Sequence, residues 1–235
     1  TFPATAQNVK AMMDAFDSLI IKPTNSSIGR GVMKLERKGN LWHLVYPLNL
    51  KLTNRTWRTI KFRQYLPVLL RRRIQNSSYM VQQCLPLATV EGRPFDLRIS
   101  VQRGADGTWG VTGIVAKVAS NQLFLTNVAQ GGRLHSLHDI LCNHYPQLNQ
   151  DAVCRQMTSF AILVAQHLST ELPNLADLGL DIAMTHDGFP LFIECNGKDQ
   201  RYSFREADMQ DCWKATYYNP IAYAKFILGG GTPPC

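Results

Sequence analysis

The chain has 235 residues, of which 45% are hydrophobic and 18% charged, a composition that predicts a folded core and excludes an intrinsically disordered protein. Its 25 basic and 17 acidic side chains give a formal net charge of +8, so we expect an anionic partner: a nucleotide, an acidic substrate, nucleic acid or a membrane surface. Neither a long apolar run, a leader-like start nor a C-x-x-C pair occurs, which predicts a cytoplasmic protein with reduced cysteines and no membrane span.

The first third of the chain predicts a small mixed lobe. Apolar spacing indicates a helix over residues 5–18 and strands over 18–22, 32–37 and 41–46. Residues 59–74 have apolar positions at helical spacing and end in three arginines, so we expect a helix there. The segment "SYMVQQCLPL" then predicts a strand that runs into a linker, because Pro86 disfavours a helix.

The remaining chain predicts a larger lobe. The segments "FDLRISVQR" and "TWGVTGIVAKV" read as paired strands, and "TNVAQGGRL" as a loop. A long helix capped by Asp151 follows, then the hairpin "GLDIAMTHDGFPLFIECNG" and a helix over 220–228. This order predicts an α+β protein of two lobes, with boundaries at 1–85 and 86–228 and a flexible tail at 229–235.

The stretch "IIKPTNSSIGRGV" suits phosphate binding. Small residues and glycines let several backbone N–H groups approach one anion, and Lys22 precedes the loop on a strand. A lysine in that position would meet the α and β phosphates of a nucleotide under the loop. The alternative is an ordinary glycine turn beside a surface lysine, because short glycine motifs are common.

The hairpin around Asp187-Gly188 predicts a metal site. A type I′ turn at this dipeptide places Asp181 opposite Glu194, with Asn196 on the same face and Cys195 turned into the core. Two carboxylates and an amide are oxygen ligands that suit Mg²⁺ bridged to phosphates. The alternative is a solvated acidic pair at a sheet edge.

The strands on either side of Asp106-Gly107 predict a cationic surface. A two-residue turn there places Arg98 diagonally beside Lys117, with Asp96 opposite the lysine. Such a pair can receive the β and γ phosphates or an acyl phosphate. A cross-strand salt bridge on a solvated face is the alternative.

Taken together, these parts resemble the ATP-grasp superfamily over nearly the whole chain. A strand lysine, a small-residue loop, a hinge strand, D-x-R, and an Asp followed by E-x-N are arranged as in that superfamily. The segments "FDLRISVQR", "TNVAQGG" and "GLDIAMTHDGFPLFIECN" are similar to those of RimK-type glutamate ligases. "FPATAQ" and "NGKDQR" most resemble the YheC/YheD family, described as endospore coat-associated, although Asp199 stands where that family has proline.

The resemblance implies an ATP-grasp fold of two α+β lobes with the nucleotide between them, in a chain without the usual N-terminal domain. It implies ATP and Mg²⁺, with Mn²⁺ as a substitute, as cofactors. Arg98 and Lys117 would act on the transferred phosphoryl group, and Asp181, Glu194 and Asn196 would bind the metal. The implied nucleotide contacts are Lys22, Ser26, Ser27, Gly29, Gly31, Gln82, Gln83, Leu85 and Asn127, and the implied substrate contacts are Lys198 and Arg201.

The implied activity is an ADP-forming carboxylate–amine ligase that acts through an acyl phosphate on an amino acid or peptide, in a cytoplasmic and spore-associated setting. One alternative is a spore-associated structural protein that binds nucleotide without turnover. Another is a nucleic-acid binder that uses a basic cluster; no RRM, KH or zinc-finger pattern accompanies it. The members of that cluster are Arg55, Arg58, Lys61, Arg63 and Arg71 to Arg73.

Overall fold

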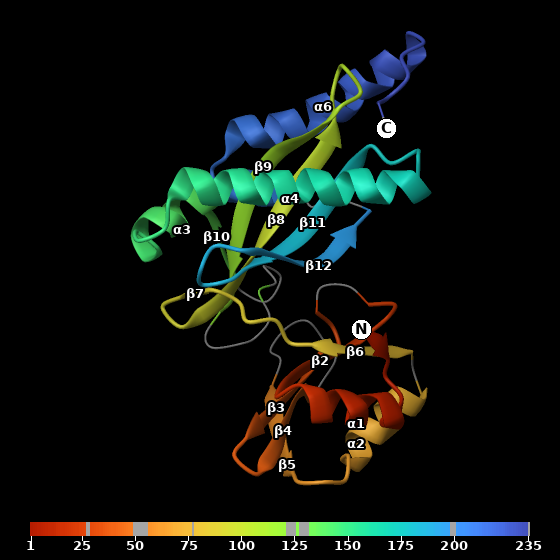
Figure 1. Cartoon of the computed structure of the whole chain (residues 1–235), viewed down its shortest axis with the longest axis vertical. Coiled ribbons are helices and arrows are strands. Elements are labelled where there is room, and N and C mark those ends of the chain that lie inside the picture. Colours follow the sequence, from red (N-terminus) through yellow and green to blue (C-terminus); the bar gives the residue numbers. More distant parts are fainter. Residues whose placement is uncertain are drawn as a thin grey trace. The chain divides into compact units, whose positions relative to one another are not determined.

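The computed structural model describes residues 1–26, 29–48, 56–76, 78–120, 126, 132–197 and 201–234. The chain divides into two compact units, Thr1–Leu85 and Pro86–Cys235 (Figure 1). Each unit combines an antiparallel sheet with helices, which confirms the predicted α+β class. Within the described residues, no helix is long and apolar enough to cross a membrane.

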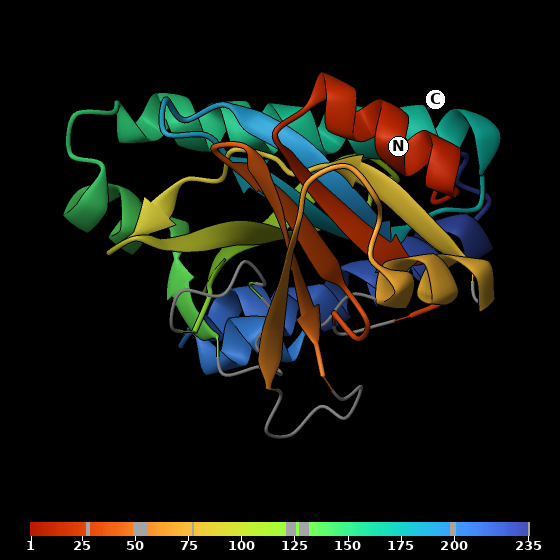
Figure 2. The ribbon, with the colours of Figure 1, turned by 90° about the horizontal axis from the view of Figure 1, so that it is seen from below.

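Unit 1 is built on an antiparallel sheet in the order β1-β6-β2-β3-β4-β5. One face of the sheet holds the apolar core, formed by residues such as Leu19, Leu35 and Val81, and the helices α1 and α2 pack on it. Figure 2 shows α1, in red, alongside β2. The elements are β1 (Phe2–Pro3), α1 (Ala6–Ala15), β2 (Ser18–Pro23), β3 (Met33–Lys38), β4 (Leu41–Pro47), β5 (Trp57–Phe62), α2 (Val68–Asn76) and β6 (Tyr79–Gln83).

The predicted helix over residues 59–74 is wrong in its first half. The segment "WRTIKF" forms β5, which pairs with β4 from Trp42–Phe62 to Pro47–Trp57. Its aromatic and β-branched residues gain cross-strand contacts in the sheet that a helix would not provide, so pairing overrides the helical spacing. The helix begins only at Val68, after Pro67, whose fixed φ suits the start of a helix.

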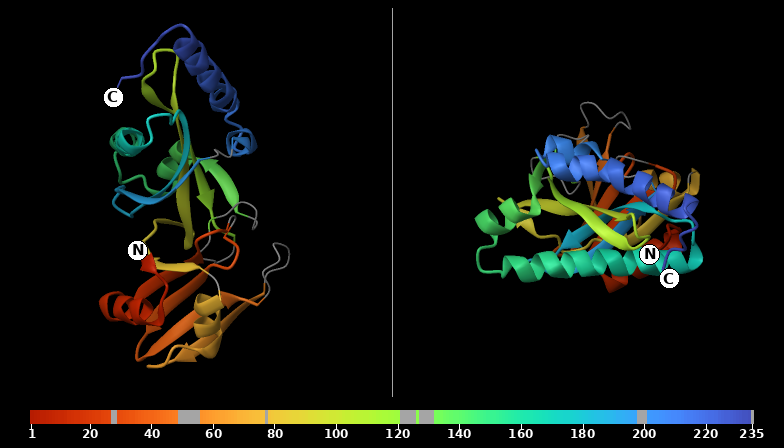
Figure 3. Two further views of the ribbon diagram at one scale, coloured as in Figure 1. Left: turned by 90° about the vertical axis from the view of Figure 1, so that its right-hand side faces the viewer. Right: turned by 90° about the horizontal axis from the view of Figure 1, so that it is seen from above.

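Unit 2 contains a sheet in the order β10-β9-β8-β11-β12, with β7 paired to β8. Figure 3 shows α4 and α6 on opposite faces of this sheet, and Figure 1 shows α4 crossing the strands. The elements are β7 (Thr89–Val90), β8 (Arg93–Arg103), β9 (Trp109–Val118), β10 (Arg133–Ser136), α3 (Leu137–His144), α4 (Gln150–Glu171), β11 (Asp177–Met184), β12 (Pro190–Asn196), α5 (Tyr202–Glu206) and α6 (Gln210–Leu228).

The helix α4 covers the apolar face of this sheet. It buries Val153, Met157, Ala161 and Ala165, four residues apart, and these side chains join the core with residues of β8, β9 and β11. Its N-cap is Asn149, whose side chain accepts a hydrogen bond from the Ala152 N–H at 2.9 Å. The prediction of Asp151 as the cap is therefore wrong, and that residue lies in the first turn.

The helix α6 covers part of the other face and begins ten residues before the predicted start. Pro220 lies inside it, where its missing N–H leaves the Thr216 carbonyl, four residues earlier, without an intrahelical donor. The Gln102 side chain of β8 supplies that donor, with its Nε2 2.9 Å from the Thr216 oxygen. A contact with the sheet thus offsets the proline, which explains why Pro220 does not mark the start of the helix.

Two hairpins in unit 2 have the predicted strand pairing, but their turns differ from the predicted ones. Positive φ occurs at Gly107 and Gly188 but at neither preceding aspartate, so both turns are three-residue loops that end in a glycine, and the predicted type I′ turn is wrong. Each longer loop shifts the pairing by one residue. A bulge between Ser100 and Val101, and another between Asp181 and Ile182, then restores the predicted register.

Replacing Gly113 in β9 by alanine is expected to destabilise the protein by about 1–3 kcal/mol. A Cβ there would lie 2.6 Å from Cε1 of Phe204, a fully buried ring in α5, so the contact between α5 and the sheet must shift. Gly110→Ala in the same strand is the control, because a Cβ there meets nothing within 4 Å. Equal losses in the free energy of unfolding, measured in urea, would contradict this account.

Candidate functional site

Four charged side chains form a buried cluster on the face of the unit 2 sheet opposite α4. Asp96 and Arg98 come from β8, Lys117 from β9 and Asp181 from β11, and each residue as a whole is 3–7% exposed. The register produces the cluster, because Asp96 pairs with Lys117 and Asp181 pairs with Arg98. The predicted diagonal of Arg98 and Lys117 is confirmed, but the alternative of a solvated salt bridge is wrong because the cluster is buried.

Asp181 is the centre of the cluster. Arg98 donates to both of its oxygens, from Nε at 2.8 Å and from Nη2 at 3.1 Å, and Lys117 Nζ lies 2.9 Å from Oδ1. The Asn196 side-chain amide donates to Oδ2 at 3.3 Å. Two cations therefore hold this carboxylate in place, and burial strengthens their attraction to it.

Lys117 lies between two carboxylates. Its Nζ is 3.0 Å from Oδ1 of Asp96 and 2.9 Å from Oδ1 of Asp181. Burial lowers the pKa of Lys117, but these two carboxylates outweigh that effect, so the pKa lies above its ordinary value and the ammonium stays charged. Burial raises the pKa of Asp96; Lys117 opposes this rise, whereas Asp181 adds to it.

The charge on Asp181 gives the stability a defined pH dependence. Burial alone would raise the pKa of Asp181, but Lys117 and Arg98 outweigh burial and hold it below its usual value. A depressed pKa stabilises the fold above the unfolded value, and this stability is lost as the pH falls through the folded value. We expect the difference in unfolding free energy between wild type and Asp181→Asn to narrow below about pH 4. A constant difference down to acid unfolding would contradict this.

The predicted metal ligands lie together at one edge of the sheet. Asp181 pairs directly with Glu194, and Gly179 pairs with Asn196, which confirms the predicted register. Glu194 is exposed on the edge strand β12. Cys195 is also exposed, so its predicted place in the core is wrong: β12 is an edge strand and leaves the thiol uncovered.

The donor set fits Mg²⁺ by chemistry, because two carboxylates and an amide all supply oxygen ligands. Among the described residues, no group of three His, Cys, Asp or Glu side chains is placed to hold a metal, so the amide of Asn196 is needed to complete this set. The four hydrogen bonds to Asp181 fill the acceptor capacity of a carboxylate. A metal ion at Asp181 would therefore replace the Asn196 donor, and rotation of that amide would present its oxygen.

In unit 1, Lys22 lies on β2 opposite Met80, on the sheet face turned away from α1 and α2. Gly29 and Gly31 both have positive φ, and the Ser26 hydroxyl donates to the Arg30 carbonyl at 3.0 Å, so the described part of the loop turns sharply. Gln82 lies on the Lys22 face of β6, Gln83 ends this strand, and Leu85 ends the unit. Ser27 lies outside the described residues.

In unit 2, Arg201 is the predicted substrate residue that the structure describes, and Asn127 and Lys198 lie outside the described residues. The Arg201 guanidinium donates to Asp177 and lies 4.8 Å from the centre of the Tyr217 ring. These contacts join Arg201 to the α6 side of the sheet, four residues along β11 from Asp181. The site residues that sequence reasoning did not single out are Asp96, noted only as opposite Lys117, and Thr126.

The described members of the basic cluster do not form one surface. Arg58 and Lys61 point to opposite faces of β5, since they lie three residues apart on a strand. Arg73 is on α2, where it donates to the Pro47 carbonyl at 3.0 Å and lies over the Tyr46 ring. Arg55 lies outside the described residues.

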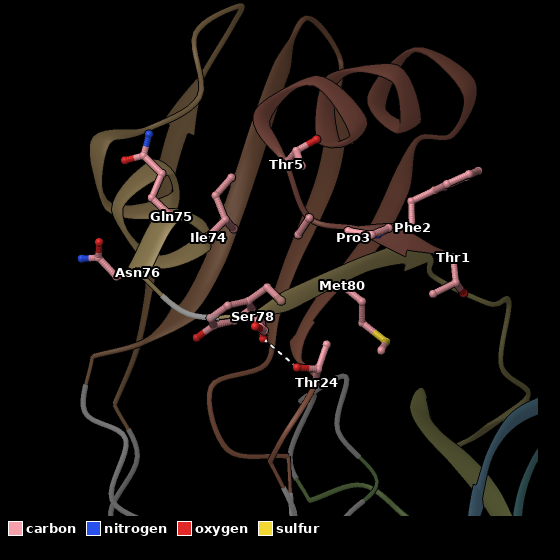
Figure 4. Close-up of a pocket in the computed structure, with 12 residues that line it drawn as sticks. Thr1, Phe2, Pro3, Thr5, Thr24, Ile74, Gln75, Asn76, Ser78 and Met80 are labelled. Carbon is pink, nitrogen blue, oxygen red and sulfur yellow. Dashed lines mark hydrogen bonds between the residues drawn. The ribbon is translucent and has the colours of Figure 1, made fainter.

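Unit 1 also contains a surface pocket of about 580 Å³ at its N-terminal edge (Figure 4). Its lining comes from β1, the end of α2 and β6, and includes Phe2, Ile74 and Met80. The Thr24 hydroxyl donates to the Ser78 carbonyl at 3.2 Å beside it. None of the predicted site residues that the structure describes lines this pocket.

The sequence matches the family described as YheC/D-like ATP-grasp over residues 2–227. Two curated relatives come from Bacillus subtilis (strain 168). Endospore coat-associated protein YheD is 21% identical over 224 residues, which cover 93% of this chain and 48% of YheD. Endospore coat-associated protein YheC is 23% identical over 198 residues, covering 84% of this chain and 53% of YheC. The chain thus spans about half the length of these relatives.

A solved structure with a similar chain is the ADP complex of N5-carboxyaminoimidazole ribonucleotide synthetase. It is 14% identical, has a TM-score of 0.44 and covers 83% of this chain and 38% of its own. The family match, by contrast, extends over nearly the whole sequence and includes both units. The protein belongs to the YheC/D-like ATP-grasp family.

Proposed function

We propose that the protein is an ATP- and Mg²⁺-dependent ligase that joins a carboxylate to an amine and releases ADP. The observation that carries the proposal is the buried cluster of Arg98, Lys117 and Asp181, in a chain of an ATP-grasp family. Two fixed cations beside an edge that carries Glu194 and Asn196 suit a bound polyphosphate. The net charge of +8 favours both an anionic nucleotide and a carboxylate substrate.

In the proposed reaction, a carboxylate oxygen of the substrate attacks the γ-phosphorus of ATP, and the bond to ADP breaks. The product is an acyl phosphate, and an amine then attacks its carbonyl carbon, so that an amide forms and phosphate leaves with the proton that the amine loses. Arg98 and Lys117 would orient the phosphoryl oxygens and offset their charge. Asp181, Glu194 and Asn196 would hold Mg²⁺, which when bound neutralises phosphate charge.

The phosphate contacts in unit 1 would come from Lys22 and the loop with Ser26, Ser27, Gly29 and Gly31. Gly29 and Gly31 both have positive φ, a backbone conformation that occurs in anion-binding loops. Gln82, Gln83 and Leu85 would contact the adenine ring, and Asn127 would contact phosphate. Lys198 and Arg201 are proposed substrate contacts. Mn²⁺ is an alternative to Mg²⁺ as the metal.

The test is ADP release with pools of amino acids and peptides as carboxylate donors, run with and without hydroxylamine. We expect ADP release that requires both Mg²⁺ and a carboxylate, and hydroxylamine should trap the acyl phosphate as a hydroxamate. Lys225→Met, which removes an exposed lysine near the end of α6, should release ADP at the wild-type rate. ADP release that is independent of any carboxylate would contradict the ligase assignment.

A second candidate is a spore-associated protein that binds nucleotide without turnover. The names of both Bacillus subtilis relatives state an association with the endospore coat and no reaction. On this candidate the same cluster would hold Mg·ATP as a structural ligand. Retained Mg·ATP binding without ADP release from any donor pool favours it over the ligase.

A further inference from the structure

Asp96 is a buried carboxylate for which the proposed chemistry gives no role. It lies on β8 two residues before Arg98, so both side chains point to the same face of the sheet, and it pairs directly with Lys117 of β9. Its side chain is 9% exposed. Burying a carboxylate is costly unless it is well paired, so its contacts are the first guide to what it does.

The two oxygens of Asp96 have different partners. Oδ1 is 3.0 Å from Lys117 Nζ, whereas Oδ2 accepts a hydrogen bond from the Thr126 hydroxyl. Thr126 is itself buried. Because the hydroxyl engages one oxygen, it sets the rotation of the carboxylate and directs the other oxygen at the lysine.

Lys117 is consequently held from two sides. Asp96 approaches from the neighbouring strand, and Asp181 approaches from β11, which lies beyond β8. Lys117 donates a hydrogen bond to Asp181 and forms an ion pair with Asp96, whose Oδ1 is 3.0 Å from Nζ. The two carboxylates together restrict the position of the ammonium, since a four-carbon side chain would otherwise sample many rotamers.

We propose that Asp96 is a positioning residue, which together with Thr126 holds the Lys117 ammonium where it meets a phosphoryl oxygen. The inference rests on the proposed function, because it assigns Lys117 to the transferred phosphoryl group. Asp181 alone would leave the ammonium free to turn about a single contact. Asp96 supplies the second contact, and Thr126 fixes the orientation of that contact.

The test of the contact is a double-mutant cycle in the free energy of unfolding, with Asp96→Ala and Thr126→Val. We expect the double variant to lose less stability than the sum of the single variants, because each single change already removes the hydrogen bond. Additive losses would overturn the proposal. This measurement does not depend on ATP turnover.

The test of positioning is steady-state ADP release by Asp96→Asn. The asparagine can present its oxygen to Lys117 and its amide to the Thr126 hydroxyl, so the fold is retained while the charge is lost. We expect kcat to fall about tenfold to hundredfold while KM for ATP changes less than about threefold. Thr126→Val should also lower kcat. Thr126→Ser, which keeps the hydroxyl, should have a kcat close to that of wild type.

The control is Ser100→Ala, a fully buried position on the same strand and face whose hydroxyl has no hydrogen-bond partner among the described residues. Its kcat should match that of wild type. An unchanged kcat in Asp96→Asn, or an equal fall in Ser100→Ala, would overturn the positioning role. Wild type without ADP release would instead contradict the proposed function, and the stability cycle would then decide whether Thr126 and Asp96 act as a unit.

Discussion

Asp181→Ala is expected to lower the free energy of unfolding by about 3–5 kcal/mol, because it removes one partner from a buried ion cluster. Arg98 and Lys117 both donate to this carboxylate, and all three side chains are at most 8% exposed. The positive charges stay buried in the variant, and their lost hydration is no longer offset by Asp181. Urea denaturation of wild type and variant measures the loss.

Two further variants separate charge burial from simple loss of contacts. The double variant Asp181→Leu with Arg98→Met should be more stable than Asp181→Ala, since it removes a charge of each sign and fills the space with apolar groups. Glu36→Ala breaks a more exposed pair with Lys34, and should cost about 1 kcal/mol or less. A loss in Asp181→Ala as small as that in Glu36→Ala would contradict the account of the cluster.

Lys117→Met is expected to lower kcat for ADP release by about a hundredfold to a thousandfold. It removes one preorganised hydrogen-bond donor that would stabilise the negative charge developing in the transition state. Methionine has a similar length without the charge, and Asp181 keeps its contacts with Arg98. The affinity for Mg·ATP should change less than about tenfold, because the variant slows mainly the chemical step.

The comparison variant is again Lys225→Met, which removes an exposed lysine of α6 and the same unit of net charge. Both variants should have the same circular dichroism spectrum as wild type. Equal kcat values for Lys117→Met and wild type would remove Lys117 from the proposed chemistry, whereas equal losses in both lysine variants would indicate a general charge effect.

The strands that carry the candidate site were predictable because their side chains alternate and their turns contain glycine. Asp181 lies opposite Glu194 as predicted, although the predicted turn was too short by one residue. The bulge after Asp181 compensates for that error. The bulge has no clear sequence signature here. The predicted pairing was therefore correct because the longer turn and the bulge each shift the register by one residue and cancel.

Other features depended on tertiary contacts that a local pattern does not contain. Pro220 is tolerated inside α6 because Gln102, more than a hundred residues away in sequence, bonds the carbonyl that the proline leaves open. The strand β5 forms because β4 is there to pair with it. The link between Thr126 and Asp96 joins residues 30 apart, and neither residue type on its own indicates it.

The measurement that tests the central claim most directly is calorimetric titration of ATP with and without Mg²⁺, for wild type and Glu194→Gln. Glu194 is exposed, so its substitution should leave the fold intact while removing one proposed metal ligand. We predict micromolar binding that requires Mg²⁺ in wild type and is at least about tenfold weaker in the variant. Equal affinity in both proteins, or ATP binding that is unaffected by Mg²⁺, would contradict the assignment of this edge of the sheet as the metal and nucleotide site.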